Sequence, residues 1–300
     1  MRIGLLTKNP ETWCSSQIVR AMKATGIDPV CFGFSDLLAR VGYKPEVDIK
    51  DEVHLLGNIS AVIVRPIGRG SLDEIIFRLD LLHKLERIGV PVVNQSSSIE
   101  KAVDKYYALT LLDENGINVP RTVVTESPRK ALIAFKELGE DVVVKPVFGS
   151  RGMGVTRVSD FEVARRVFRS LAFMHNVLYV QEFVPHGTRD IRAFVVGDKV
   201  VAAMYRVAEG WRTNVSQGAK AVAFEPTSEL EQLAVKASKI LGCEISGVDI
   251  MEGPKGYVIN EINGQPGFRG LQSTTRVDIA REIVDHVLKI CSAPRACRHE

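Results

Sequence analysis

The chain has 300 residues, more than one typical domain, so two or three packed units are expected. Hydrophobic residues make up 45% of the sequence and charged residues 25%, which is the composition of an ordinary globular protein. The formal net charge of +3 is too small, and its basic residues too evenly mixed with acidic ones, to indicate a nucleic-acid partner.

The sequence has no pattern typical of a membrane span, a signal peptide, a zinc site or a disulfide framework, and this limits the expected compartment and partners. No apolar run approaches the roughly 18 residues of a membrane span, and residues 2–7 are expected to form a strand rather than part of a signal peptide. The five cysteines are scattered, without the spacing of a zinc site or a disulfide framework. We therefore expect a cytoplasmic protein that binds neither a membrane nor a nucleic acid.

The first 95 residues alternate between short β-branched runs and helical periods. Strands are expected at 2–7, 30–34, 61–64 and 90–94, and helices at 16–24 and 73–88. This alternation predicts an N-terminal α/β unit, residues 1–95, with a doubly wound parallel sheet. No glycine fingerprint follows the first strand, so a dinucleotide site is not predicted there.

A linking helix is expected within residues 96–120, with Ser97 as its N-cap and Glu100 completing a capping box. Its buried stripe would consist of Ile99, Ala102, Val103 and Tyr106. Lys105 lies beside this stripe, and by spacing alone it is a solvent-exposed helix lysine.

From residue 121 the pattern restarts. Strands are expected at 122–125, 142–145, 155–158 and 177–184, and helices at 127–138 and 161–173. They predict a small central α/β unit over residues 121–184. The remainder, residues 185–300, has two predicted hairpins, at 191–205 and 245–263, and helices at 229–241 and 278–288, so the C-terminal part is expected to be α+β.

A glycine-rich loop follows the β run that ends in Lys145. Gly149, Gly152 and Gly154 allow backbone N–H groups to approach a ligand closely, and Arg151 adds positive charge. In a P-loop the lysine follows the glycines and opens a helix, whereas here it precedes them. The pattern predicts a lid over a polyphosphate; the alternative is a glycine-rich hairpin with a surface lysine.

The second C-terminal hairpin carries Asp249, Glu261 and Asn263. Glu261 and Asn263 share a strand face, and pairing across the turn places Asp249 nearly opposite Glu261. Two carboxylates and an amide oxygen suit Mg²⁺, which keeps waters and phosphate oxygens among its ligands. Alternatively, one acid faces solvent and the other pairs with an arginine.

The first hairpin and the segment after it supply Arg192, Arg206, Arg212 and Asn214. The planar guanidinium group of arginine can donate two parallel hydrogen bonds to the oxygens of a phosphate or a carboxylate. Each of these arginines alone could equally be in a surface ion pair. Together with the lid and the acidic pair they predict catalysis by positioning and charge stabilisation of a transferred phosphoryl group.

In chain order these motifs resemble the ATP-grasp ligases, and among them the RimK-type amino-acid ligases. The motifs are Lys-Pro after a β run, the glycine lid, Gln-Glu-Phe-Val, Asp-Ile-Arg, Arg-Thr-Asn, Gly-Val-Asp-Ile and Asn-Glu-Ile-Asn. The resemblance spans about residues 94–290 and implies an ATP-grasp fold. It also implies the family's reaction, in which ATP phosphorylates a carboxylate, an amine attacks the acyl phosphate, and an amide, ADP and phosphate form.

The resemblance implies a role for each matching residue. The hinge reading adenine would run from Glu182 to Val184, and Asp190 would meet the ribose. The ATP-binding residues would be Lys105, Lys145, Gly149, Ser150, Arg151, Gly152, Met153, Gly154, Glu182, Phe183, Val184, Asp190, Arg192 and Thr213. The catalytic residues would be Arg206, Arg212 and Asn214, and two Mg²⁺ ions, replaceable by Mn²⁺, would be held by Asp249, Glu261 and Asn263. A homo-oligomer is compatible with the resemblance.

The segment Val215-Ser216-Gln217-Gly218-Ala219 departs from the protein-modifying branch, which has a basic residue before paired glycines. It is more similar to ligases that add L-glutamate to a coenzyme, with tetrahydromethanopterin favoured and the deazaflavin coenzyme next. One alternative is a glutamate ligase acting on a protein tail, such as a ribosomal protein or an amino-group carrier. Another is an ATP-binding regulator without turnover. Arg65 and Arg69 could bind the acceptor's carboxylates, or could be ordinary loop charges.

Overall fold

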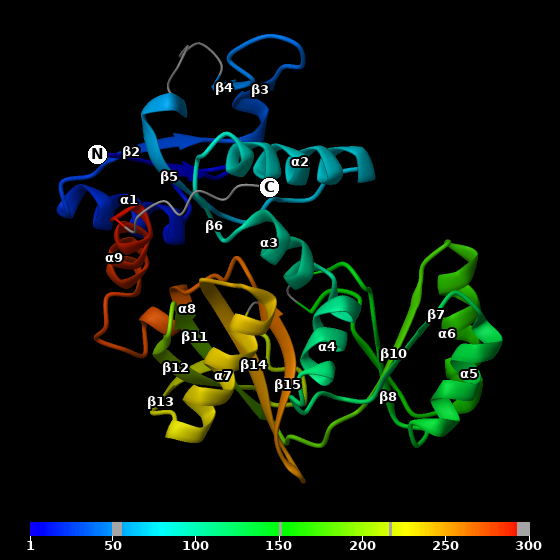
Figure 1. Cartoon of the computed structure of the whole chain (residues 1–300). Helices are drawn as coiled ribbons and strands as arrows, with labels where there is room; N and C mark the ends of the chain where they lie inside the picture. The colour runs from blue at the N-terminus through cyan, green and yellow to red at the C-terminus, as the bar shows by residue number, and fades with distance from the viewer. Residues whose placement is uncertain (50–55, 150–151, 216–217, 293–300) are drawn as a thin grey trace.

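The computed structural model describes residues 1–49, 56–149, 152–215 and 218–292. In this part the strands form three larger sheets and one two-stranded ribbon, arranged as three lobes (Figure 1). The predicted lid residues Ser150 and Arg151, together with Ser216 and Gln217, lie outside the described residues. No described helix has the length and apolar character needed to cross a membrane.

The N-terminal sheet is parallel throughout, as predicted. Its order is β2 (Asp28–Phe32), β1 (Arg2–Leu6), β5 (Ile59–Val64) and β6 (Val92–Val93). Because side chains alternate along a strand, Leu5 faces the core shared with α1 (Trp13–Ala24), and Leu6 faces the core shared with α2 (Leu72–Arg87).

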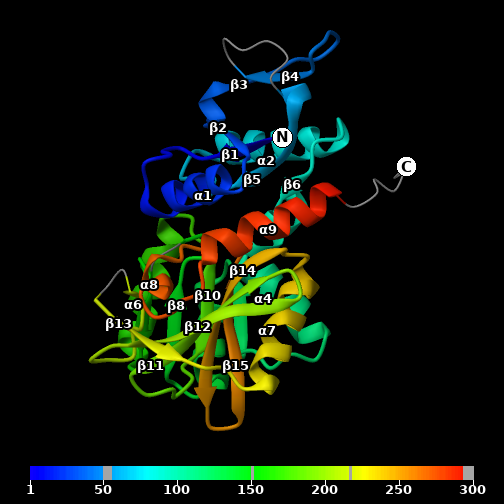
Figure 2. The same cartoon turned by 90° about the vertical axis from the view of Figure 1, so that its left-hand side faces the viewer.

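The last helix, α9 (Ile279–Ser292), packs beside α1 on the N-terminal sheet, although it follows the C-terminal sheet in the chain. Figures 1 and 2 both show the red α9 between the blue N-terminal lobe and the lower lobe. One hydrophobic core therefore includes residues of the N-terminal sheet, the C-terminal sheet and α9, and the domain division stays a prediction.

Smaller elements extend the N-terminal lobe. A ribbon of β3 (Leu37–Ala39) and β4 (Val47–Ile49) was not predicted. Two 3₁₀ turns, η1 (Phe34–Asp36) and η2 (Leu56–Asn58), lie beside it in the chain.

The linking segment is two helices, not one: α3 (Ser96–Val103) and α4 (Lys105–Glu114). The predicted cap is wrong, because Gln95 occupies the N-cap position and makes no side-chain cap. Asp104 interrupts the helix, and its carboxylate accepts hydrogen bonds from the N–H groups of Tyr106 and Tyr107 to begin α4. Val103, the last residue of α3, and Tyr106, in the first turn of α4, are both exposed, so these two members of the predicted stripe are not buried.

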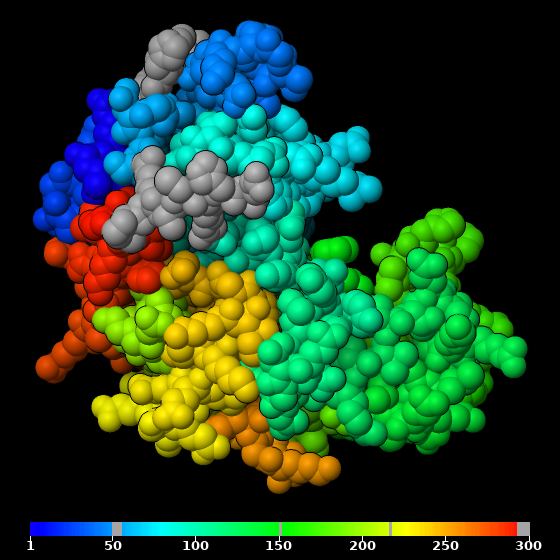
Figure 3. Space-filling model, in the orientation of Figure 1, coloured from blue at the N-terminus to red at the C-terminus, as the bar shows by residue number. Residues whose placement is uncertain are grey.

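The central sheet has the order β7 (Thr122–Thr125), β10 (Leu178–Glu182), β8 (Val142–Lys145) and β9 (Thr156–Val158), and every pair is antiparallel. Helices α5 (Pro128–Glu137) and α6 (Phe161–Phe173) contribute Phe135 and Phe168 to its core. This lobe stands out from the rest of the molecule in the space-filling view (Figure 3). The predicted lid connects β8 to β9 at its inner edge.

The C-terminal sheet is antiparallel. Its order is β13 (Lys220–Phe224), β12 (Lys199–Val207), β11 (Arg189–Val196), β14 (Ile245–Gly253) and β15 (Gly256–Asn263). Both predicted hairpins are confirmed, whereas the edge strand β13 was not predicted. Helix α7 (Ser228–Leu241) covers one face, and a short α8 (Arg269–Gln272) follows β15.

The N-terminal sheet is joined to the ends of β14 and β15 by buried polar contacts. The Asn94 side chain donates to the carbonyl oxygens of Ile245 (2.6 Å) and Gly264, and accepts from the N–H of Ile245 (2.8 Å). Arg65 donates to the carbonyl oxygen of Pro266 at 3.1 Å. These contacts hold the loop after β15 in place.

Candidate active site

A cleft of about 870 Å³, open to solvent, lies between the central and C-terminal sheets. Most of the predicted site residues line it, although they come from distant parts of the chain. They are Lys105, Lys145, Gly149, Gly152, Met153, Glu182, Phe183, Val184, Asp190, Arg206, Arg212, Thr213, Asn214, Asp249 and Glu261. The lining therefore includes the lid, the hinge and two of the three proposed metal ligands.

Three predicted site residues in the described part do not line the cleft. Gly154 takes a positive φ of 77° in the lid, beside Pro146. Asn263 donates to the carbonyl oxygen of Gly247 at 3.4 Å. Arg192 pairs with Asp249 from the neighbouring strand.

Lys145 ends β8 at the cleft and is 7% exposed. Its Nζ donates to Oδ1 of Asn260 at 3.2 Å and lies 5.5 Å from the centre of the Tyr179 ring. Burial lowers the pKa of Lys145 to about 8, although the nearby Glu261 carboxylate favours its charged form. It is therefore a buried cation whose charge is lost at mildly alkaline pH.

Lys105 is the first residue of α4 and is not the solvent-exposed lysine that its spacing alone predicted. Its Nζ donates to the carbonyl oxygen of Gly149 in the lid at 2.8 Å. It lies 3.6 Å from Oε1 of Glu261, and its side chain is 11% exposed. Because the helix restarts at Asp104, this lysine points into the cleft and connects the lid to the β15 carboxylate.

Asp249 is buried between two arginines. Arg192 donates to both of its carboxylate oxygens, through Nε and through Nη2, the latter at 3.0 Å from Oδ2. Nη2 of Arg206 lies 3.2 Å from Oδ2. Burial would raise the pKa of the Asp249 carboxyl, but the two guanidinium groups lower it below its usual value, so this side chain is a carboxylate.

Asp190 forms the other half of this network. It lies directly opposite Arg206 in the strand register, and Arg206 donates to it through Nε (2.7 Å) and Nη2 (2.5 Å). The Thr213 hydroxyl donates to the same carboxylate at 2.6 Å. Despite burial, Asp249 and Asp190 raise the pKa of Arg206. Both oxygens of Asp190 are therefore engaged by protein donors.

Asp249 and Glu261, predicted to lie nearly opposite each other, are direct partners across β14 and β15. The register shifts between Asp249 and Ile250, so that Asn260 is the extra residue of a bulge on β15, and Asn260 lines the cleft beside Glu261. The alternative was that one acid pairs with an arginine and the other faces solvent. Asp249 does pair with arginines, but Glu261 faces the cleft rather than bulk solvent.

These oxygens fit a Mg²⁺ ion that takes part of its coordination from a phosphate. Among the described residues Glu261 has one ion-pair partner, Lys105, at the long distance of 3.6 Å, which leaves acceptor capacity on its carboxylate. Within the described ranges no three His, Cys, Asp or Glu side chains form a complete metal cage. A hard cation held by two carboxylates and an amide would need water or ligand oxygens as well, which is typical of Mg²⁺.

Several residues that line the cleft are not among the predicted site residues, and two of them, Asn260 and Trp211, carry groups that could contact a ligand. Asn260 belongs to the Asn-Glu-Ile-Asn motif, but strict alternation assigns it to the face opposite Glu261, and the bulge overrides that alternation. Trp211 precedes the Arg-Thr-Asn motif, and its ring meets that of Phe183 edge-on, with centroids 5.8 Å apart. Arg212 donates to the carbonyl oxygen of Val155 at 3.2 Å, so this segment also contacts the lid.

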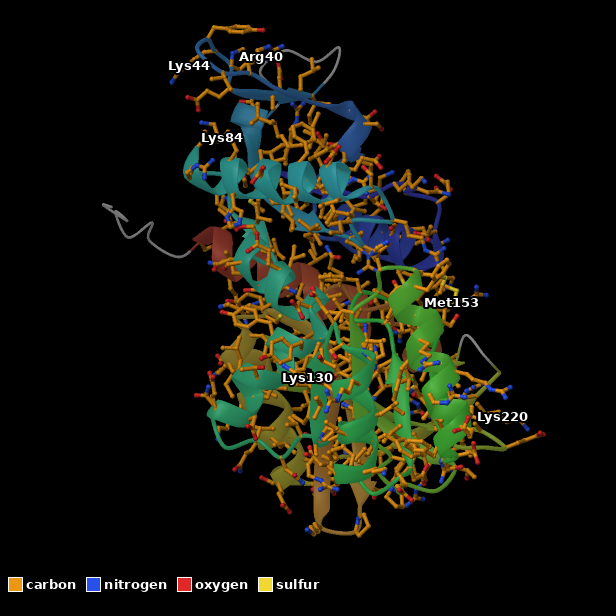
Figure 4. The ribbon with its side chains drawn as sticks, turned by 90° about the vertical axis from the view of Figure 1, so that its right-hand side faces the viewer. Arg40, Lys44, Lys84, Lys130, Met153 and Lys220 are labelled. Carbon is orange, nitrogen blue, oxygen red and sulfur yellow. The ribbon has the colours of Figure 1, made fainter. Side chains whose placement is uncertain are left out.

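Arg65 and Arg69 have different environments. Arg65 is 8% exposed and forms part of the joint with the loop after β15. Arg69 is exposed, and its Nη2 lies 3.5 Å from the sulfur of Met153 in the lid. Figure 4 labels Met153, which lies near the level where the N-terminal lobe meets the other two.

Comparisons with known proteins agree with this architecture. A family model described as the RimK PreATP-grasp domain matches residues 1–99, and one described as the RimK-like ATP-grasp domain matches residues 102–287. The tetrahydromethanopterin:alpha-L-glutamate ligase of Methanococcus maripaludis is 36% identical over 96% of this chain and 98% of its own. The alpha-aminoadipate–LysW ligase LysX of Sulfurisphaera tokodaii is 35% identical over 78% of this chain and 82% of its own.

The fold is also that of a solved ligase. The ATP-grasp ligase PsnB, in complex with a minimal precursor, Mg and ADP, superposes with a TM-score of 0.74 at 22% sequence identity, covering 97% of this chain and 98% of its own. The predicted ATP-grasp fold is thereby confirmed. The chain belongs to the RimK-like ATP-grasp family and is an ATP-dependent ligase.

Proposed function

We propose that this ligase joins L-glutamate to a small acidic coenzyme, with tetrahydromethanopterin as the first candidate and the deazaflavin coenzyme as the second. The substrate assignment is supported by three relatives named tetrahydromethanopterin:alpha-L-glutamate ligase, at 32–36% identity over 96% of this chain. The chemistry is supported by one observation: the paired Asp249 and Glu261 share a cleft with Lys145 and the lid.

In the proposed reaction a carboxylate of one substrate takes the γ-phosphoryl group of ATP, and the amine of the other displaces phosphate to form the amide. Lys105 and Lys145 would hold the ATP phosphates, and the hinge from Glu182 to Val184 would take the adenine. Arg212 and Asn214 would contact the transferred group. Charge stabilisation by positioned donors is the main source of rate enhancement in such transfers.

Two Mg²⁺ ions, held by Asp249, Glu261 and Asn263, would neutralise charge on the phosphoryl oxygens. The two arginines beside Asp249 keep it ionised and therefore able to bind a cation. Because Arg206 is engaged by two carboxylates, its proposed contact with phosphate would have to come from the remaining Nη1 group.

For the acceptor we propose a contact with Arg69 and not with Arg65. The loop carrying Arg69 is held rigidly, because Arg78 donates to the carbonyl oxygens of Ile67 and Arg69, both at 3.0 Å. The Arg69 guanidinium is thereby presented beside the lid, and its one side-chain contact within the described part of the chain, with a sulfur, leaves donors for a carboxylate. Arg65 is buried in the joint between lobes, where a carboxylate of a bulky acceptor has no access.

Kinetics of an Arg69→Ala variant would test this contact. Loss of one exposed charge-assisted hydrogen bond, worth about 1.5–3 kcal/mol, should raise the KM for the acceptor by at least about tenfold. The KM for ATP should stay unchanged. Arg169→Ala, which removes an exposed arginine from the outer helix α6, is the matched control. An unchanged acceptor KM in the Arg69 variant would contradict the assignment.

The substrate is tested by ADP release with Mg-ATP and L-glutamate against tetrahydromethanopterin, the deazaflavin coenzyme and an acidic peptide. Mass spectrometry would then look for a gain of one glutamyl residue on each acceptor. A glutamylated coenzyme is the expected result. Modification of the peptide alone would support the second candidate, a ligase acting on a protein tail, which the 35% identity to LysX favours. Nucleotide binding without any turnover would favour a non-catalytic regulator.

A further inference from the structure

We propose that Gly247 is a positioning residue for the metal ligand Asp249, because it leaves the space in which the Arg192 side chain lies. Arg192 in turn fixes both oxygens of Asp249. This inference rests on the proposed role of Asp249 as a Mg²⁺ ligand, and it explains why a glycine stands two residues before that aspartate.

The space over Gly247 is filled by Arg192. Gly247 and Asp249 share one face of β14, because side chains two apart on a strand point the same way. Arg192 lies directly opposite Asp249 on β11. A Cβ atom on Gly247 would lie 2.6 Å from Nη1 of Arg192 and 3.2 Å from its Cδ. Both distances are too short for non-bonded contacts, which are optimal at about 3.5–4.0 Å.

The backbone at Gly247 does not itself require glycine. Its φ lies outside the left-handed region, so an L-residue can adopt the conformation. Steric room for Arg192 is therefore the reason for glycine at this position.

On the other side of Gly247 lies Pro266, whose loop is held in place by hydrogen bonds. The same Cβ would lie 3.0 Å from Cβ of Pro266. Pro266 accepts a hydrogen bond from Arg65, and the neighbouring Gln265 bonds to the backbone of Arg65 and Ile67. This loop is thus attached to the N-terminal sheet at several points. A methyl group at position 247 would displace the flexible end of Arg192 rather than the proline.

Displacing Arg192 would release one side of Asp249. The two parallel donors of Arg192 hold the carboxylate plane, as expected for a bidentate arginine–carboxylate pair. Without them Arg206, through Oδ2, is the remaining ion-pair partner of Asp249 among the residues that the structure describes, and the carboxylate can rotate. Partners that orient a metal ligand typically change metal affinity by about 10–100-fold when removed.

The test is a double-mutant cycle of Gly247→Ala and Arg192→Ala, read out by the Mg²⁺ dependence of ADP binding in calorimetry. Each single variant should raise the Mg²⁺ midpoint by about tenfold or more. The double variant should be little worse than Arg192→Ala alone, because removing the Arg192 side chain removes the 2.6 Å clash and leaves the methyl group only the 3.0 Å contact with Pro266. ADP affinity at saturating Mg²⁺ should change little. Additive effects, or an unchanged midpoint in Gly247→Ala, would overturn the proposal.

Gly57→Ala is the matched control, because a Cβ there would meet no described residue within 4 Å and η2 is not part of the cleft. It should leave the midpoint unchanged, and a comparable shift in this variant would also count against the proposal. If the wild-type protein bound ADP without any Mg²⁺ dependence, both the metal assignment and this inference would fail. If no acceptor were glutamylated but the cycle behaved as expected, only the proposed substrate would fail.

Discussion

Replacing Arg206 with methionine would remove the cation that joins two buried carboxylates. Arg206, Asp190 and Asp249 have side chains that are 5–6% exposed. Removing one partner of a buried ion pair costs about 3–5 kcal/mol, because the remaining charge is left without compensation. Here two aspartates lose a partner, although Thr213 and Arg192 still donate to them. We therefore expect a destabilisation of about 4 kcal/mol rather than a larger value.

The expected loss can be measured by thermal unfolding. In domains of 150–250 residues, 1 kcal/mol shifts Tm by about 2–4 °C, so the Arg206→Met variant should melt about 10 °C lower. Arg157→Met is the control, because Arg157 binds Asp141 with the same two-donor geometry (2.7 and 2.6 Å) but both side chains are more than one-third exposed. An exposed pair contributes at most about 1 kcal/mol, so this variant should shift Tm by less than about 4 °C.

Equal shifts in the two variants would refute the reasoning, because they would show that burial does not decide the cost. A shift below about 3 °C for Arg206→Met would refute it as well, because it would correspond to less than about 2 kcal/mol. Adding Asp190→Leu to Arg206→Met should recover part of the loss, since one uncompensated charge is then removed.

Three further outcomes are expected. Burial lowers the pKa of Lys145 to about 8, so its ammonium group loses its charge as the pH rises through that value. ATP affinity measured by calorimetry should therefore fall between about pH 7 and 9. The Lys145→Arg variant should not show this pH dependence, and a flat wild-type profile would contradict the prediction. Glu261→Ala should abolish turnover while leaving Tm nearly unchanged, and a near-native rate would show that the metal assignment is wrong. Asn94→Ala removes three buried hydrogen bonds between lobes and should cost about 2–4 kcal/mol in denaturant unfolding; an unchanged midpoint would mean that the joint contributes nothing to stability.

Local patterns were sufficient for much of the fold. Alternation of β-branched runs with helical periods predicted the parallel N-terminal sheet, and the ordered motifs predicted the ATP-grasp fold. The turn between β14 and β15 joins strands that are adjacent in the chain, so counting residues on either side brings Asp249 to the level of Asn260, next to Glu261, and the register shift at Asn260 then makes Glu261 the direct partner. The compartment, the oligomeric state and the domain boundaries stay predictions.

Helix interruptions were harder to predict. A continuous helix and a break at Asp104 use the same apolar residues, and an aspartate is common both in helices and at their N-caps. The break redirects Lys105 toward the lid, so a side chain that spacing assigns to solvent lies in the cleft.

Composition and local spacing are enough to establish which residue types are present and which strands pair across short turns. The pairing of opposite charges on strands far apart in the chain depends on how the strands are arranged in the folded sheet. Arg192 and Asp249 are 57 positions apart, and their contact depends on the register of β11 against β14. The same register places Arg192 over Gly247. In the same way α9, the last helix of the chain, packs on the N-terminal sheet, whose first strand begins at residue 2. Such contacts form only when separate elements pack together, so they cannot be predicted from the local hydrophobic pattern of any one segment.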